Sequence, residues 1–290
     1  MGYRSWINSE CGDGYMNDTR SEFSMLAARE PIPLARAALL MAKEEYPDLD
    51  IDKYLDQLTT LAREAEPIVK AGNDTVERIQ LLSDFLFTQK GFAGNRDEFG
   101  DPRNSFLNDV LERRLGIPIT LSLLYIEIGR RLGLNLFGVS FPAHFLVKAV
   151  DERGELIIDP FNGGSILGLD EIRARLAQIY GQPVDLHPSM LKAVGARHIL
   201  SRMLRNLKNL YVTGSDWPRA LSALDRILLL DPRSLDELLE RGGLYEKLEC
   251  FSAALDDFQS FLNQAPGEHP GADNARESVV RLMRQVARIN

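Results

Sequence analysis

Six pairs of residues in the last third of the chain recur at one fixed spacing of 34 residues. Within each pair the residues match in type: tyrosine, alanine, proline, or leucine with leucine or phenylalanine. The pairs are Tyr211 and Tyr245, Ala220 and Ala254, Leu221 and Leu255, Leu224 and Phe258, Leu228 and Leu262, and Pro232 and Pro266. Such a period indicates stacked helical hairpins, in which small residues let two helices approach and each proline ends a unit. The sequence therefore predicts two α-helical repeats, with a capping helix over 275–289.

A period of 34 residues is that of the tetratricopeptide repeat, whose first helices line a concave face that binds peptides or helices. The spacing places Arg202, Arg205 and Asn209 on this face of the first unit. Arg205 and Asn209 are four residues apart, so they would lie one above the other and could hold a carboxylate. The alternative is that they are solvated surface or are covered by the first domain. A protein or peptide partner is expected at the repeats.

The chain before the repeats combines helical and β patterns. Apolar residues recur at three- and four-residue steps, or lie between capping and stop residues, in six predicted helices. These are 34–45, 50–69, 73–87, 106–114, 118–132 and 170–180. Short β-rich runs are found at 136–141, 144–150 and 155–159. The expected fold class is α+β, with a small antiparallel sheet in the core, followed by an α-helical repeat domain.

Shifts in composition predict where the domains begin and end. Residues 1–17 are polar and are expected to form a disordered tail. Residues 181–188 are rich in glycine, proline and polar side chains, which indicates a domain boundary. The predicted parts are the tail, a helical region at 18–100, a core at 101–188 and the repeat domain at 189–290.

Three stretches of the core are similar to a known family: 114–121 (RLGIPITL), 141–145 (FPAHF) and 158–161 (IDPF). With the repeats, they make the chain resemble the bacterial SirB-type family, in which a transglutaminase-like, papain-like core precedes tetratricopeptide repeats. In that superfamily a cysteine at a helix N-terminus attacks an amide carbonyl, a histidine acts as the base and an aspartate orients the histidine. The resemblance assigns the last two roles to His144 and Asp159.

The expected hairpin supports this pairing from the residues themselves. If the turn pairs Val150 with Glu155, then His144 and Asp159 share one face as diagonal neighbours within hydrogen-bond reach. We expect the pair to face the start of the helix at Pro118. The position of the superfamily's cysteine falls on or near Pro118 itself, so the nucleophile is missing, as in the SirB-type family.

Other residues of this region have competing interpretations. Neither Cys11, in the tail, nor Cys250, in the second repeat, is placed to replace the missing nucleophile. Thr120 is a candidate hydroxyl in the first turn of the helix, but support of the helix start is the favoured interpretation. Asn104 could project into the same cleft or cap the helix that follows it. The family's motif usually has glycine where Ala143 stands.

Composition argues against several classes of function. The net charge of −8 does not favour a nucleic-acid binder, which needs a basic face. No apolar run reaches the roughly 18 residues of a membrane span, and no secretory signal is recognised, so the cytoplasm is the expected compartment. The four histidines show no ligand spacing, so neither a metal nor another cofactor is expected.

Two functions follow from these patterns. The first is a non-enzymatic interaction or regulatory protein, with a degenerate transglutaminase-like cleft and a repeat surface that binds a partner. The alternative is an amide hydrolase or transferase that uses His144 and Asp159 with a non-cysteine nucleophile or an activated water. A hydroxyl within about 3.2 Å of His144 would favour the alternative.

Overall fold

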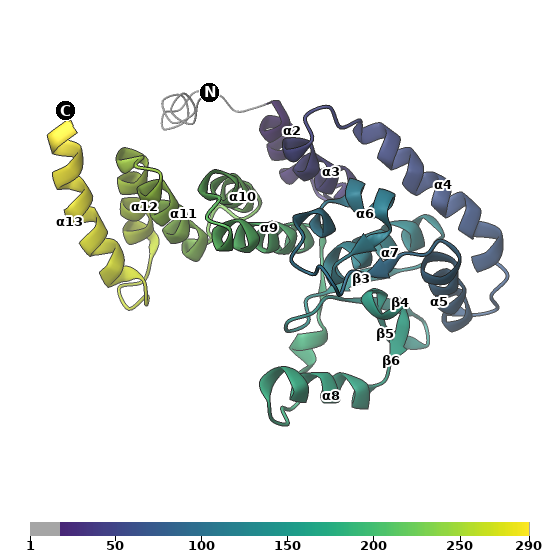
Figure 1. Ribbon diagram of the computed structural model, residues 1–290. Helices are drawn as coiled ribbons and strands as arrows, with labels where there is room; N and C mark the ends of the chain where they lie inside the picture. Colours follow the sequence, from purple (N-terminus) through teal and green to yellow (C-terminus); the bar gives the residue numbers. More distant parts are fainter. Residues whose placement is uncertain (1–17, 290) are drawn as a thin grey trace. The chain divides into compact units, whose positions relative to one another are not determined.

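The computed structural model describes residues 18–289 and divides them into two units (Figure 1). The core unit is Arg29–Met203, and the repeat unit combines the chain from Leu204 onward with residues 18–28. The predicted tail at 1–17 lies outside the described residues. The helical region predicted at 18–100 is therefore divided, because helix α2 (Asp18–Ala27) packs on the repeats.

The core unit begins with three helices that the sequence predicted and the structure confirms. They are α3 (Leu34–Glu45), α4 (Ile51–Val69) and α5 (Thr75–Ser83), the last continued by a π-helical segment, η1 (Asp84–Gln89). Asp50 and Asp74 cap two of them, since their carboxylates accept from the N–H groups of Lys53 and Glu77 at 3.2 and 3.0 Å. Asp50 and Asp74 thus fix where α4 and α5 start.

Helix α7 lies at the centre of the core unit and is buried along most of its length. The chain reaches it through β1 (Ala93–Gly94), the 3-10 turn η2 (Pro102–Ser105), α6 (Leu107–Arg113), β2 (Leu115–Gly116) and α7 (Pro118–Arg131). β1 and β2 pair in parallel. Gly129 lets α7 approach the sheet, because a Cβ there would lie 2.3 Å from the side chain of Leu136.

The main sheet is antiparallel, with strand order β6-β5-β4-β3-β7. Its strands are β3 (Leu136–Val139), β4 (Leu146–Asp151), β5 (Gly154–Asp159), β6 (Ser165–Leu167) and β7 (Ala193–Val194). Val150 pairs with Glu155, so the predicted hairpin register is confirmed. Strands β6 and β7 were not predicted, since two or three residues are too few to show an alternating pattern.

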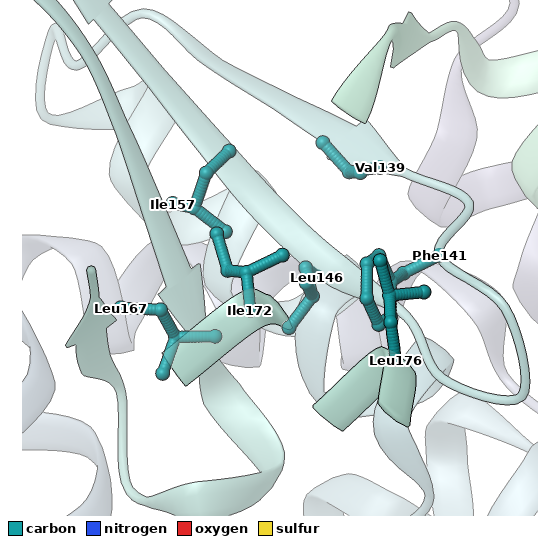
Figure 2. Close-up of a cluster of buried hydrophobic side chains, with 7 residues drawn as sticks. All are labelled: Val139, Phe141, Leu146, Ile157, Leu167, Ile172 and Leu176. Carbon is teal, nitrogen blue, oxygen red and sulfur yellow. The ribbon is translucent and has the colours of Figure 1, made fainter. Parts of the chain in front are cut away.

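The two faces of the sheet are covered by different helices. α7 packs on the face that contains Leu136, and α8 (Leu169–Tyr180) packs on the other. The core under α8 is a cluster of buried apolar side chains (Figure 2). They are Val139, Phe141, Leu146, Ile157, Leu167, Ile172 and Leu176. Asp159 shares the face of Ile157, because alternate residues of a strand point the same way.

The repeat unit confirms two helical hairpins and a final helix. Its helices are α9 (Ala196–Thr213), of which the part up to Met203 belongs to the core unit, α10 (Trp217–Leu230), α11 (Leu235–Lys247), α12 (Phe251–Gln264) and α13 (Ala272–Ile289). The small repeat residues Ala220 and Ala254 are fully buried. Gly242 lies against Phe258, whose ring is 3.0 Å from the site of a Cβ. With the antiparallel sheet of the core unit, this confirms the predicted α+β class.

None of the helices within residues 18–289 combines the length and apolar character that a bilayer crossing requires.

A half-buried arginine links three helices of the repeat unit. Arg241 of α11 donates to Asp225 of α10 at 2.8 Å and to both oxygens of Asp257 of α12 at 2.8 and 2.7 Å. Arg20 of α2 pairs with the second oxygen of Asp225 at 3.1 Å. Burial by itself lowers the pKa of Arg241, but the two carboxylates outweigh it and raise that pKa. The network therefore holds the helices together as ionised groups.

Replacement of Arg241 by methionine should destabilise the repeat unit by about 3–5 kcal/mol, because Asp225 and Asp257 would remain buried without their shared cation. The measurement is urea unfolding followed by circular dichroism. Arg276→Met is the matched control, since its pair with Asp273 is exposed and should contribute no more than about 1 kcal/mol. Similar losses in the two variants would contradict a structural role for the buried network.

Candidate functional site

The site predicted from the sequence is formed at the ends of two neighbouring strands. His144 precedes β4, and Asp159 is the last residue of β5. Nε2 of His144 lies 2.9 Å from Oδ1 of Asp159, so the predicted hydrogen bond is confirmed. The Asp159 side chain is fully buried, whereas that of His144 is 16% exposed. The histidine therefore joins a buried carboxylate to the surface.

Asp159 is held by several donors at once. Oδ1 also accepts from the backbone N–H groups of Phe161 and Asn162, at 3.1 and 3.3 Å. Oδ2 accepts from the side-chain amide of Asn162 at 2.5 Å and from Arg175 of α8. Burial raises the pKa of Asp159, but the hydrogen bonds and charges of His144, Asn162 and Arg175 outweigh it and lower the pKa to about 2. Asp159 is therefore ionised at neutral pH.

The ionised carboxylate determines which nitrogen of His144 carries the proton. A carboxylate only accepts hydrogen bonds, so Nε2 must donate to it. In the neutral imidazole the lone pair then lies on Nδ1. Among residues 18–289, Nδ1 has no hydrogen-bond partner. The site thus presents one oriented acceptor, which is also a base.

The backbone before His144 is constrained. Ala143 has a φ of 50°, in the left-handed region that favours glycine. This conformation costs an alanine roughly 1 kcal/mol relative to glycine. The alanine is exposed, so its methyl group adds no buried contact.

The hydroxyl of Thr120 is used to build the start of α7. Oγ1 donates to the backbone oxygen of Asn104 at 2.8 Å and accepts from the N–H of Ile117 at 3.1 Å. Its side chain is fully buried. No hydroxyl among the described residues hydrogen-bonds to His144, and Cys250, the cysteine that the structure describes, belongs to the repeat unit. Thr120 is therefore a structural residue in this geometry.

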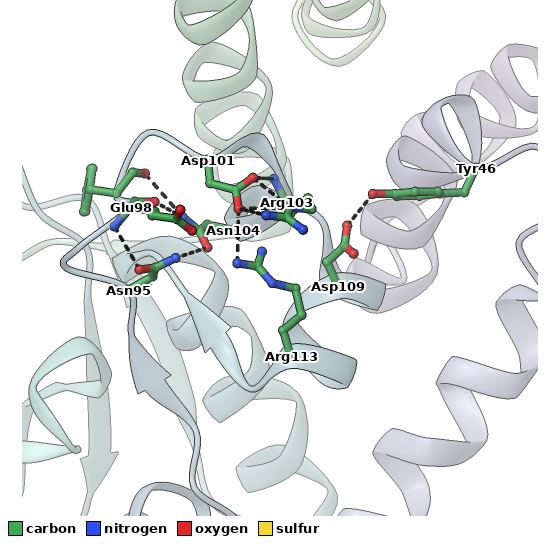
Figure 3. Close-up of polar contacts among 9 residues, drawn as sticks. Tyr46, Asn95, Glu98, Asp101, Arg103, Asn104, Asp109 and Arg113 are labelled. Atoms are coloured by element: carbon green, nitrogen blue, oxygen red, sulfur yellow. Dashed lines mark hydrogen bonds and ion pairs between the residues drawn. The ribbon is translucent and has the colours of Figure 1, made fainter.

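Asn104 has a structural role that the sequence did not identify. Its side chain accepts from Asn95 at 3.0 Å and donates to the backbone oxygen of Glu98 at 2.7 Å (Figure 3). The N-cap of α6 is instead Phe106, which makes no side-chain cap bond. Asn104 is fully buried and fixes the loop that follows β1. Neither proposed role, helix cap or cleft residue, describes these contacts.

Two aromatic rings lie beside His144: Phe99, in the loop after β1, and Phe161, in the turn after β5. The ring of Phe161 meets the rings of His144 and Phe99 edge to face, with centroids 5.9 and 6.1 Å apart. The guanidinium of Arg96 lies 4.9 Å from the centroid of Phe161, and Arg96 also bonds to Asn162. A Cβ at Gly94 would be 2.5 Å from the Phe161 ring, so this arrangement needs glycine in β1.

The three residues predicted on the repeat face differ in their contacts. Arg202 lies in the core unit, where it donates to the hydroxyl of Ser140 at 2.6 Å and to the backbone oxygen of Phe141 at 3.2 Å. Arg205 donates to buried Glu237 of α11 at 2.5 Å, within the repeat unit. Asn209 is exposed. The binding role of these three residues remains a prediction.

Possible metal ligands are not clustered in the part of the chain that the structure describes. Within residues 18–289 there is no cluster of three or more histidine, cysteine, aspartate or glutamate side chains that could hold a metal ion. His144 and Asp159 are bonded to each other and to hydrogen-bond donors. The chemistry that these residues offer is therefore hydrogen bonding and proton transfer.

Comparison with known proteins agrees with this architecture. Residues 52–205 match the model of the transglutaminase-like superfamily, and residues 207–287 match a tetratricopeptide repeat model. A UPF0162 protein of Xylella fastidiosa (strain Temecula1) is 41% identical over 263 residues, which cover 87% of this chain and 91% of that protein. The chain belongs to the UPF0162 family, within the transglutaminase-like superfamily.

Other relatives differ in how much of the chain they cover. A UPF0162 protein of Vibrio cholerae is 31% identical over 255 residues, or 87% of this chain and 93% of that protein. F-box only protein 21 of Mus musculus is 32% identical over 203 residues, or 63% of this chain and 31% of that protein. The predicted combination of a transglutaminase-like domain with tetratricopeptide repeats is confirmed. The SirB-type relationship and the loss of a catalytic cysteine remain predictions.

Arg202 should hold the segment that leads to His144, because it bonds to Ser140 and Phe141 and its guanidinium lies 5.6 Å from the ring centroid of Phe145. Arg202→Ala should increase amide hydrogen exchange in residues 141–145 about tenfold or more, the effect of losing one charged hydrogen bond. Arg205→Ala, one turn further along α9, breaks only the Glu237 contact and should leave that segment unchanged. Equal exchange in the two variants would contradict this positioning role.

Proposed function

We propose that the core unit is a non-enzymatic binding module, in which His144 and Asp159 recognise a ligand, and that the repeat unit recruits a protein partner. The observation behind this proposal is the start of α7. Pro118 occupies its first position, and the Thr120 hydroxyl is buried in bonds to Asn104 and Ile117. The described residues thus supply His144 with its aspartate but with no hydroxyl to activate.

The pair has properties that suit recognition. Nδ1 of His144 is an acceptor for an N–H or O–H donor, and the ring of Phe161 stands at its edge. Asp159 and Arg175 prevent the imidazole from turning, so little orientational freedom is lost when a ligand binds. A backbone amide of an extended peptide, with an apolar side chain against Phe161, is the ligand that these groups fit best.

The repeats support the second half of the proposal. Tetratricopeptide units bind helices or extended peptides, and two such units are present with a final helix, α13. A protein with a ligand-binding core and a partner-binding repeat can act as an adaptor or a regulator. We place this action in the cytoplasm.

An amide hydrolase that uses water is the second candidate. Its support is the tautomer of His144, since ionised Asp159 leaves the lone pair on Nδ1, where a general base needs it. In that reaction Nδ1 would take a proton from water as the oxygen attacks the amide carbon. The same proton would then go to the leaving nitrogen.

The test uses the full chain, a peptide library and dimethylcasein as an amide probe. Peptides selected on the wild type should bind His144→Ala about tenfold or more weakly, because the acceptor is lost. They should bind His187→Ala, the control with an exposed histidine elsewhere in the core unit, as tightly as the wild type. The wild type should release no more ammonia or new amino termini from dimethylcasein than His144→Ala does.

Two results would contradict the proposal. If the selected peptides bind His144→Ala as tightly as they bind the wild type, they do not bind at this site. Hydrolysis of dimethylcasein by the wild type, lost in His144→Ala, would favour the hydrolase.

A further inference from the structure

Helix α2 belongs to the repeat unit and contacts α10, although the whole core unit separates the two helices in sequence. It packs on α10 through one face. The buried residues of that face are Thr19, Phe23, Leu26 and Ala27. They follow the spacing of an amphipathic helix, and Phe23 is only 1% exposed, whereas Met25 on the other side is 62% exposed. α2 therefore lies on α10 in the way that a helical peptide lies on a receptor.

The surface under α2 is specific in its chemistry. The carboxylate of Asp225 pairs with Arg20 at 3.1 Å, and the guanidinium of Arg226 lies 5.9 Å from the ring centroid of Phe23. Both Asp225 and Arg226 are buried. The surface thus combines a carboxylate that can bind an arginine, a guanidinium that can pack on an aromatic ring, and apolar contacts around them.

The charges of the network explain why an arginine is required there. Asp225 and Asp257 carry two negative charges, and Arg241 between them carries one positive charge. Arg20 supplies the second positive charge through the oxygen of Asp225 that Arg241 does not contact. A buried carboxylate without its full complement of donors is costly. The α10 surface therefore favours a helix that brings a cation to Asp225.

The buried residues of α2 have the spacing of a helix that docks through one face. Thr19, Phe23, Leu26 and Ala27 lie three or four residues apart along the helix, so their side chains share the side that faces α10. Helices that fold into a groove are a recurrent form of protein recognition, with anchors at the spacing seen in α2.

We propose that the face of α10 containing Asp225 and Arg226 is a docking site for an amphipathic helix of a protein partner, and that α2 occupies this site within its own chain. The partner helix has an arginine three residues before an aromatic residue and a leucine three residues after it, as in α2. Attachment to the same chain gives α2 a high effective concentration, so it holds the site until a stronger helix displaces it. The proposal is independent of the ligand proposed at His144.

The test measures binding of a synthetic peptide with the sequence of residues 18–28, fluorescently labelled, to full-length variants. Phe23→Ala in the protein weakens its own α2, so the wild-type peptide should bind this variant about tenfold or more tightly than it binds the wild-type protein. Arg20→Ala leaves no cavity, so the affinity of the peptide for this variant should increase by a smaller factor. Met25→Ala, on the exposed face, should behave as the wild type does. A peptide that contains Phe23→Ala should bind none of the proteins.

A further substitution locates the site and keeps the test decisive if Phe23→Ala is unstable. Asp225→Asn, combined with Arg20→Ala in the protein, should weaken peptide binding relative to Arg20→Ala alone. Equal binding of the peptide by all the variants, or by none, would overturn the proposal. Light scattering that shows dimers in Arg20→Ala but not in the wild type would also overturn the proposal. The site would then bind α2 from a second copy of the chain and not the helix of another protein.

Discussion

The carboxylate of Asp159 is the constraint on which the candidate site depends. It is fully buried, so it stays ionised only because His144, Asn162 and Arg175 offset the loss of water. These donors come from the β3–β4 connection, the turn after β5 and helix α8, so a single charge fixes three parts of the core unit. Removal of any one donor would increase the free-energy cost of keeping the carboxylate ionised and buried. The imidazole would then lose its fixed orientation.

The same constraint fixes the direction of the His144 imidazole. A histidine bonded through Nε2 to an ionised carboxylate is oriented in the way that a catalytic base is. The described chain nevertheless places no hydroxyl at Nδ1, since Thr120 is committed to Asn104 and Ile117. What remains is an acceptor with fixed direction beside an aromatic ring, which is the chemistry of recognition as much as of proton transfer.

Much of this arrangement was predictable because it depends on local patterns. The 34-residue period predicted the helices of the repeats, and the β-rich runs with their turn predicted the register that brings His144 to Asp159. The rest depends on contacts between residues distant in sequence. Arg175 reaches Asp159 only because α8 folds over the sheet, and Arg202 belongs to the core unit only because α9 starts there. The spacing of residues along the sequence does not predict either contact.

The most direct measurement of the central claim is the tautomer of His144, read from nitrogen chemical shifts of its imidazole at pH 8 in the full chain. Ionised Asp159 predicts a protonated Nε2 and an unprotonated Nδ1, with the Nε2 proton protected from exchange. Asp159→Ala should remove that protection, because Nε2 loses its acceptor. A proton on Nδ1 in the wild type, or protection that survives Asp159→Ala, would contradict the account of this site.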